Sequence, residues 1–306
     1  MITRDTQPLK MMSSLQDLPL QPTEDGSFTF FSPEFGEAFH SRFGAKGEAQ
    51  SKFVEPLNLA AKATAPRLKI LDICYGLGYN TAAALAAIWE VNPNCQVEMI
   101  GLELDQGVPQ RAIAQGLLND YPLPIPEYLK TLGTQLQITS HNLQGKLLIG
   151  DARETLKQVY DSGFQADAIC LDPFSPPTCP GLWTVEFLAM VAQCLKPDGG
   201  RLATYSCAAA VRTALMMAGL AIASSTPFGR RAPGTIASWD GVGLPPLTEK
   251  ELEQLNTRAA IPYRDPNLGD RHQSIIERRQ TEQAGSPLEP SSHWKKRWIS
   301  ATIDNQ

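Results

Sequence analysis

The feature that most constrains this chain is an alternation of short apolar runs with helix-forming segments between residues 68 and 224. This alternation predicts a mostly parallel, doubly wound α/β sheet with helices on both faces. The predicted strands are 68–74, 97–103, 146–149, 166–171 and 201–205. The predicted helices are 81–89, a stretch ending at 118, 153–160, 183–195 and 208–218.

The flanking segments predict additions to one main domain rather than a second core. Three prolines and no hydrophobic period before residue 28 predict a flexible arm, and a polar tail after 245 predicts a helical extension. The predicted parts are an arm at 1–27, a main domain at 28–245 and an extension at 246–306. The main domain is predicted to hold a hairpin at 28–36, a helix at 46–64 and a Pro-rich insertion at 119–142, and the extension is predicted to hold helices at 249–255 and 267–280.

Composition excludes several classes of protein. The chain has 306 residues, of which 42% are hydrophobic, enough for a sizeable core and too many for wholesale disorder. No apolar run is long enough to span a membrane, and the polar start has no apolar signal region behind it, so we expect a cytoplasmic protein with no membrane attachment. The six cysteines form no C-x-x-C pair and stand near no His at ligand spacing, so we expect ordinary thiols and no metal.

The net charge of −5 is unevenly distributed along the chain. Residues 1–200 carry 14 Lys and Arg against 22 Asp and Glu, whereas residues 201–306 carry 13 against 10. An acidic total argues against indiscriminate nucleic-acid binding but leaves room for a local basic face that docks an RNA. Arg230 and Arg231 are candidates for a phosphate contact or for a mere loop end, and the cluster at 295–297 is a weaker candidate.

The carboxyl ends of the predicted strands carry the candidate site, because ligands of open α/β sheets bind there. The first strand ends in the sequence DICYGLGYN, at residues 72–80. Its two glycines, Gly76 and Gly78, allow a tight turn and the close approach of a ligand, but the spacing matches neither a dinucleotide fingerprint nor a P-loop. Asp72 would repel a diphosphate and attract the amino group of an amino-acid-bearing cofactor.

The next two strands end in further acids. Glu103 can accept hydrogen bonds from both hydroxyls of a ribose. Asp151, followed by Ala152, can receive an adenine amino group while capping the next helix. Each acid alone could equally be a solvated cap, but three acids at adjacent strand ends beside a glycine loop favour S-adenosylmethionine over a nicotinamide dinucleotide.

The fourth strand ends in a stiff loop that would face the reactive methyl group of that cofactor. It reads DPFSP at residues 172–176, followed by PGLWT at 180–184. Asp172 can accept a hydrogen bond from an attacking amine, and Phe174 could stack on a flat substrate ring. The alternative is a rigid surface loop whose Asp only starts a turn. His40 is predicted to be a structural residue rather than a base.

These motifs resemble a known family. They are the strings from Phe31 to Ser41, Gly44-Ala45, Glu48-Ala49, the loop 72–80 and, most specifically, DPFSP with PGLWT. Over about residues 28–280 the chain resembles the methyltransferase half of the bifunctional tRNA 5-methylaminomethyl-2-thiouridine biosynthesis enzyme, in a stand-alone form.

The resemblance implies a Rossmann-like class I methyltransferase that uses S-adenosylmethionine and no flavin. The family converts the 5-aminomethyl group of a (2-thio)uridine at the tRNA wobble position into 5-methylaminomethyl. It implies a tRNA partner and an amine supplied by another enzyme, and we expect no obligate protein partner. The implied cofactor-binding residues are Asp72, Cys74, Tyr75, Gly76, Gly78 and Asn80 for the methionine part, Glu103 for the ribose, Asp151 and Ala152 for the adenine, and Asp172. Asp172 is also the implied catalytic residue, and Pro173, Phe174, Arg230 and Arg231 are the implied substrate contacts.

Three alternatives stay open. The chain could be a methyltransferase of the same fold that acts on a small amine, or a non-catalytic RNA-binding module that keeps the fold. It could also be an aminopropyl transferase, although that activity would call for consecutive glycines in the first loop, where this chain has Gly76-Leu77-Gly78.

Overall fold

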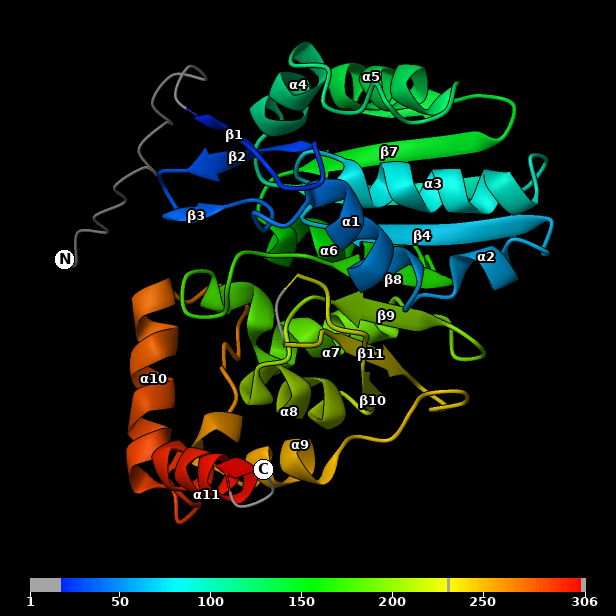
Figure 1. Cartoon of the computed structure of the whole chain (residues 1–306). Coiled ribbons are helices and arrows are strands. Elements are labelled where there is room, and N and C mark those ends of the chain that lie inside the picture. Colours follow the sequence, from blue (N-terminus) through cyan, green and yellow to red (C-terminus); the bar gives the residue numbers. More distant parts are fainter. Residues whose placement is uncertain (1–17, 230–231, 304–306) are drawn as a thin grey trace.

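The structure is a computed structural model that describes residues 18–229 and 232–303 (Figure 1). Within these residues, the main sheet has eight strands in the order β10-β11-β9-β8-β4-β5-β7-β6. The five strands predicted from the sequence form its parallel centre. They are β4 (Arg67–Ile73), β5 (Gln96–Glu103), β7 (Leu143–Ile149), β8 (Ala168–Leu171) and β9 (Arg201–Thr204).

Three strands at the two ends of the sheet were not predicted from the sequence. They are β6 (Gln137–Thr139), β10 (Ala221–Ser224) and β11 (Thr235–Ser238), and each pairs antiparallel with its neighbours. Each is only three or four residues long, and β10 and β11 are rich in Ala and Ser, which carry little strand signal. The prediction of a mostly parallel Rossmann-like sheet is nevertheless confirmed.

The strand order reverses at the boundary between β4 and β8. The chain places β5 and β7 on one side of β4, and β8 and β9 on the other. In the parallel ladder Ile73 lies opposite Leu171, so β4 and β8 end level with each other. Ligands of doubly wound sheets bind in the crevice outside such a reversal. The loops that begin after Ile73 and Leu171 therefore flank the expected binding crevice.

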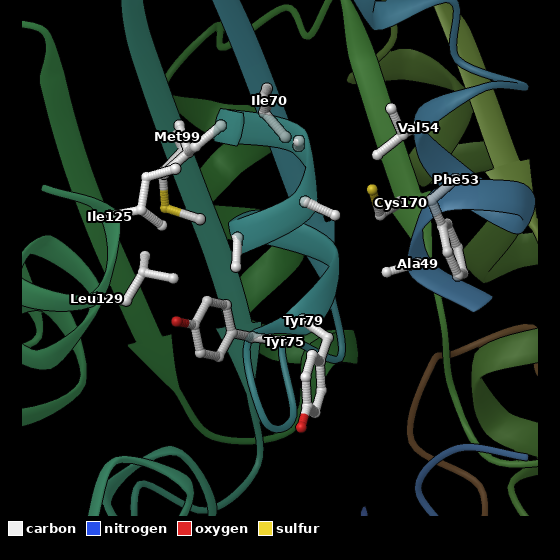
Figure 2. Close-up of a cluster of buried hydrophobic side chains, with 14 of the residues drawn as sticks. Ala49, Phe53, Val54, Ile70, Tyr75, Tyr79, Met99, Ile125, Leu129 and Cys170 are labelled. Carbon is white, nitrogen blue, oxygen red and sulfur yellow. The ribbon is translucent and has the colours of Figure 1, made fainter. Parts of the chain in front are cut away.

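Helices cover both faces of the sheet, as predicted. Side chains alternate along each strand, so Ile70 and Cys170 enter one core and Leu71 and Leu171 enter the other. Figure 2 shows part of the first core, which α3 (Tyr79–Val91) and α5 (Ile125–Gln135) cover. The second core lies under α6 (Ala152–Asp161), α7 (Val185–Gln193) and α8 (Ala209–Met217). The remaining helix of the alternation is α4 (Gly107–Ala114).

The helix predicted at 46–64 is wrong as a continuous element. It is divided into α1 (Ala45–Ala49), the π-helical η1 (Gln50–Val54) and α2 (Leu59–Lys62). Pro56 has no N–H to donate, and Asn58 takes a left-handed φ of 57° that restarts the chain as α2. The insertion predicted at 119–142 holds α5 and β6, so it is ordered structure.

The chain adds a small sheet before the main one. It consists of β1 (Leu20–Pro22), β2 (Phe28–Ser32) and β3 (Glu37–Ala38), all antiparallel. The hairpin predicted at 28–36 is thus confirmed, while β1 stands in the segment predicted to be an arm. The part of that arm at 1–17 lies outside the described residues.

A helical extension follows the main sheet, as predicted. It holds α9 (Glu249–Gln254), the short 3-10 helix η3 (Arg258–Ala260), α10 (His272–Gly285) and α11 (Ser291–Ile303), of which α11 was not predicted. Figure 1 shows α10 and α11 in orange and red, beside the half of the molecule that holds α7 and α8. Among the helices at 18–229 and 232–303, none is long and apolar enough to cross a membrane.

A buried arginine ties this extension to the sheet. Arg212 of α8 is 1% exposed, and its guanidinium donates to Ser224 Oγ at 2.6 Å and to Thr235 Oγ1 at 3.1 Å. It also pairs with Glu251 Oε1 of α9 at 2.9 Å. A buried guanidinium is tolerated only when its donors are satisfied, so this network fixes β10, β11 and α9 around α8.

We predict that Arg212→Met lowers the free energy of unfolding by about 3–5 kcal/mol, because it leaves the Glu251 carboxylate without its buried cation. Chemical denaturation measures the change. The matched control is Lys157→Met, which removes an exposed pair with Glu154 and should cost less than about 0.5 kcal/mol. Equal effects of the two substitutions would contradict the assigned role of Arg212.

Candidate functional site

The loop after β4 has a backbone shaped for close approach. Cys74, Gly76 and Gly78 have φ values of 66°, 57° and 89°, and α3 begins directly after Gly78. A Cβ at Gly78 would lie 2.7 Å from the Tyr75 hydroxyl oxygen, so only glycine fits there. Cys74 holds a left-handed conformation without being glycine, a kind of strain that clusters at ligand sites. Tyr75 itself is 3% exposed and lies in the core, where it supports the loop from below (Figure 2).

Asp72, at the base of this loop, has a free oxygen. The side chain is fully buried, and Thr81 donates its hydroxyl to Oδ2 at 2.6 Å. Among the described residues, Oδ1 has no hydrogen-bond partner. Burial raises the pKa of Asp72 to about 7, and the charge of Glu103 adds to that effect. A buried carboxylate oxygen without a partner is costly unless a ligand supplies a donor.

Glu103 joins the ends of β4 and β5. Its carboxylate accepts the backbone N–H of Gly76 at 2.7 Å on Oε2 and that of Asp105 at 3.0 Å on Oε1. Burial raises the pKa of Glu103 to about 7, although these hydrogen bonds oppose the rise. Each oxygen keeps further acceptor capacity, which suits a pair of neighbouring hydroxyls.

Asn80 connects α3 to the loop after β8. Its Nδ2 donates to Asp172 Oδ2 at 2.8 Å, while its own Oδ1 is buried without a partner among the described residues. Asp172 is half-buried, and burial followed by the charge of Glu48 raises its pKa well above the usual range. The structure therefore brings two predicted site residues from either side of the strand reversal into direct contact.

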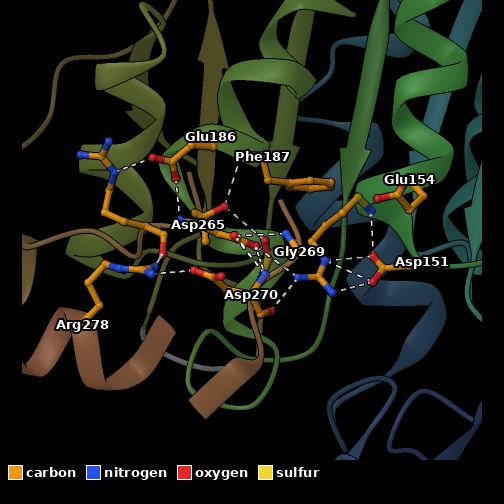
Figure 3. Close-up of polar contacts among 12 residues, drawn as sticks. Asp151, Glu154, Glu186, Phe187, Asp265, Gly269, Asp270 and Arg278 are labelled. Carbon is orange, nitrogen blue, oxygen red and sulfur yellow. Dashed lines mark hydrogen bonds and ion pairs between the residues drawn. The ribbon is translucent and has the colours of Figure 1, made fainter. Parts of the chain in front are cut away.

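Asp151 lies at the end of β7 and caps α6, as predicted, by accepting the backbone N–H of Arg153 at 2.9 Å. The guanidinium of Arg153 also binds this carboxylate, with Nη2 to Oδ2 at 2.7 Å (Figure 3). Although burial opposes it, this contact with Arg153 holds the pKa of Asp151 below its usual value. Ala152 is the first residue of α6 and is 8% exposed. Asp151 therefore stays ionised at the edge of the site.

Arg153 in turn belongs to a network with the C-terminal extension. Its Nη1 pairs with the fully buried Asp265 at 3.2 Å and donates to the carbonyl of Asp270 at 2.9 Å. Glu186 accepts the backbone N–H of Asp265 at 2.8 Å (Figure 3). No sequence pattern predicted a role for Asp265, because it lies more than a hundred residues from Arg153 in a segment without periodicity.

Phe174, predicted to stack on a substrate ring, is already packed against the N-terminal hairpin. Its ring stacks on Phe35 with centroids 4.4 Å apart and meets the edge of Phe39 at 5.1 Å. One ring face is therefore covered within the protein. Pro173 is held through its carbonyl, which accepts the Tyr205 hydroxyl at 2.9 Å. Arg230 and Arg231 lie outside the described residues.

His40 is structural, as the sequence analysis predicted. It is 9% exposed, its Nδ1 lies 3.1 Å from Thr29 Oγ1, and burial lowers its pKa to about 4. All six cysteines are free, two of them only half-buried. In the described ranges, no cluster of three or more His, Cys, Asp or Glu side chains has the arrangement of a metal site.

Comparisons with known proteins agree with this geometry. A family model described as S-adenosyl-L-methionine-dependent methyltransferase matches residues 109–240, the part of the chain that holds Asp151 and Asp172. The crystal structure of MNMC2 from Aquifex aeolicus is similar with a TM-score of 0.77 and 34% identity, over 88% of this chain and 86% of that one. An uncharacterized protein of Methanocaldococcus jannaschii is 30% identical over 85% of this chain and 71% of its own length.

The tRNA 5-methylaminomethyl-2-thiouridine biosynthesis bifunctional protein MnmC of Polaromonas naphthalenivorans is 30% identical over 67% of this chain and 32% of its own length. The chain thus spans about a third of the length of such bifunctional relatives. The identity of 34% with the Aquifex protein, over most of both chains, is high enough to assign this chain to a family. The chain belongs to the class I S-adenosyl-L-methionine-dependent methyltransferases of the MnmC family, which includes MNMC2 and the methyltransferase region of the bifunctional MnmC proteins.

Proposed function

We propose that this protein methylates the 5-aminomethyl group of a (2-thio)uridine at the wobble position of tRNA in the cytoplasm. The observation that carries the proposal is the contact of Asn80 with Asp172 at the strand reversal, beside two buried acceptors, Asp72 and Glu103. The names of the MnmC relatives support tRNA as the substrate.

The residues at the strand ends fit S-adenosylmethionine. The unpartnered Oδ1 of Asp72 suits the ammonium of the methionine part, and the spare acceptor capacity of Glu103 suits the ribose hydroxyls. Asp151 and Ala152 would hold the adenine. The backbone of the loop from Cys74 to Gly78, with Asn80, would line the methionine part. When bound, the cofactor supplies an electrophilic methyl group on a sulfonium.

Asp172 is the proposed catalytic residue. An amine attacks carbon only through a free lone pair, so an acceptor must orient the amine and take its proton. A carboxylate whose pKa is raised by burial and by Glu48 is a better base near neutral pH than an exposed one. Asn80 binds Oδ2 of Asp172, and we assign Oδ1 to the amine. Pro173 and Phe174, together with Arg230 and Arg231, are the proposed nucleotide contacts.

We predict that the protein, given S-adenosylmethionine and tRNA that carries 5-aminomethyl-2-thiouridine, adds the mass of one methylene group to that nucleoside. Nucleoside mass spectrometry after digestion of the tRNA measures the product. The free nucleoside and simple amines serve as competing acceptors under the same conditions. Methylation of these small amines without methylation of tRNA would show a small-molecule methyltransferase instead, and binding of tRNA without cofactor binding would show a non-catalytic module.

We predict that Asp172→Ala and Asp172→Asn lower the turnover number by about 10²–10⁴-fold, because the amine loses its proton acceptor. Calorimetry should still detect S-adenosylmethionine binding, since Asp72 and Glu103 are unchanged. Asp161→Asn, on the far end of α6, is the matched control and should keep the wild-type rate. Wild-type turnover by either Asp172 variant would remove this residue from the mechanism.

We predict that cofactor affinity falls as the pH is lowered. Burial places the pKa values of Asp72 and Glu103 near 7 in the free protein, and both must be ionised to receive the cofactor's donors. Protonation below that pH therefore competes with binding. Calorimetry should show about a ten- to hundredfold loss of affinity from about pH 8 to about pH 6, with proton release on binding.

The control for this pH dependence is Asp72→Asn. This variant should bind more weakly at the higher pH and should lose much of the slope, because one of the two titrating groups is gone. An affinity that stays constant between these pH values in the wild type would contradict the assigned roles of Asp72 and Glu103.

A further inference from the structure

Side chains of the N-terminal hairpin formed by β2 and β3 bind the loop that begins at Asp172. Glu37, in the two-residue strand β3, accepts the backbone N–H of Ser175 on Oε2 at 3.0 Å. Its Oε1 accepts the hydroxyl of Ser175 and, at 2.8 Å, the hydroxyl of Thr178. One carboxylate thus holds three donors of a loop that lies about 140 residues further along the chain.

Aromatic contacts from the same hairpin hold the same loop. Phe35 and Phe39, on either side of Glu37, pack on Phe174 by stacking and by an edge contact. The hairpin therefore contacts the loop at Phe174, Ser175 and Thr178, through both polar and apolar groups. Since the small sheet shares no strand pairing with the main sheet among the described residues, these contacts are a direct link between the two.

The opposite side of the loop is fixed by the main domain. Trp183 Nε1 donates to the carbonyl of Phe174 at 2.8 Å, and the Tyr205 hydroxyl donates to the carbonyl of Pro173. The backbone N–H of Asp172 donates to Ile73 at 3.1 Å. The loop is therefore held by the main domain and by the hairpin, and Asp172 is its first residue.

We propose that Glu37 is a positioning residue for methyl transfer, which holds the loop 172–178 so that the Asp172 carboxylate stays aimed at the acceptor amine. This inference rests on the proposed function. A displacement of a reacting group by about 1 Å can lower the rate by about 10²-fold. A more mobile loop would therefore lower the turnover number even though Glu37 does not contact the cofactor. Glu37 is itself half-buried and lies outside the cofactor-binding loops, which is why sequence motifs of the strand ends do not reveal it.

The test compares Glu37→Gln and Glu37→Ala with Glu34→Gln, an exposed glutamate of the same hairpin. Gln keeps the shape but can accept through only one of its two terminal atoms. Both Glu37 variants should lower the turnover number by about 10–100-fold with little change in the KM for tRNA or in cofactor affinity. Glu34→Gln should keep wild-type values. A change in KM or cofactor affinity alone would overturn the proposal.

Two further measurements separate positioning from general damage. In the Asp172→Ala background, Glu37→Gln should cause no further loss, because the group that it positions is absent. Hydrogen exchange on the cofactor-free protein should show faster exchange of the Ser175 amide in both Glu37 variants, with the amides of β4 and β8 unchanged. Additive losses, or exchange that rises throughout the sheet, would overturn the proposal.

The activity of the wild-type protein separates a failure of the proposed function from a failure of the role of Glu37. If wild-type protein does not methylate 5-aminomethyl-2-thiouridine in tRNA, the proposed function fails and the inference about Glu37 fails with it. If the wild type is active and Glu37→Gln matches it in rate and in Ser175 exchange, only the role of Glu37 is wrong.

Discussion

The hydrogen bond between Asn80 and Asp172 spans the strand reversal on which the whole site depends. Asn80 belongs to the helix that follows β4, and Asp172 follows β8, so the contact joins the two halves of the sheet at their shared edge. Around it lie Asp72 and Glu103, carboxylates that burial makes hard to ionise. Asp72 Oδ1 and Asn80 Oδ1 are buried without a hydrogen-bond partner among the described residues, which costs stability, and a ligand with donor groups would offset that cost.

The additions at both ends of the chain act on this edge rather than standing apart from it. Glu37 of the N-terminal sheet holds the loop that begins at Asp172, and Asp265 of the C-terminal extension holds Arg153, which binds Asp151. The excess of Lys and Arg over Asp and Glu in residues 201–306 is partly explained by ion pairs within the protein. Many of its arginines pair internally, among them those at 212, 264, 278 and 297, so the charge count alone overstates the surface offered to RNA.

Sequence patterns predicted what is local and periodic. The parallel strands have strong apolar runs with acids at their ends. Asp72, Glu103 and Asp172 could therefore be placed at the carboxyl edge of the sheet from the sequence alone. The strands β10 and β11 were missed because each is only four residues long and at least half of those residues are Ala or Ser, which carry little strand signal. The break at Asn58 was missed because a left-handed residue inside a helical pattern depends on tertiary packing.

Glu37 and Asp265, which hold the residues at the strand ends, were not predicted from the sequence for a different reason. A carboxylate that binds a loop about 140 residues away, or an aspartate that pairs with an arginine more than a hundred residues before it, follows no spacing rule, because the fold and not the sequence brings them together. Phe174 illustrates the consequence: its sequence position suggested a ring free to stack on a substrate, but the hairpin supplies Phe35 as the partner for one face of that ring. The strand ends therefore supply the candidate site residues, whereas segments distant in sequence determine how firmly these residues are held.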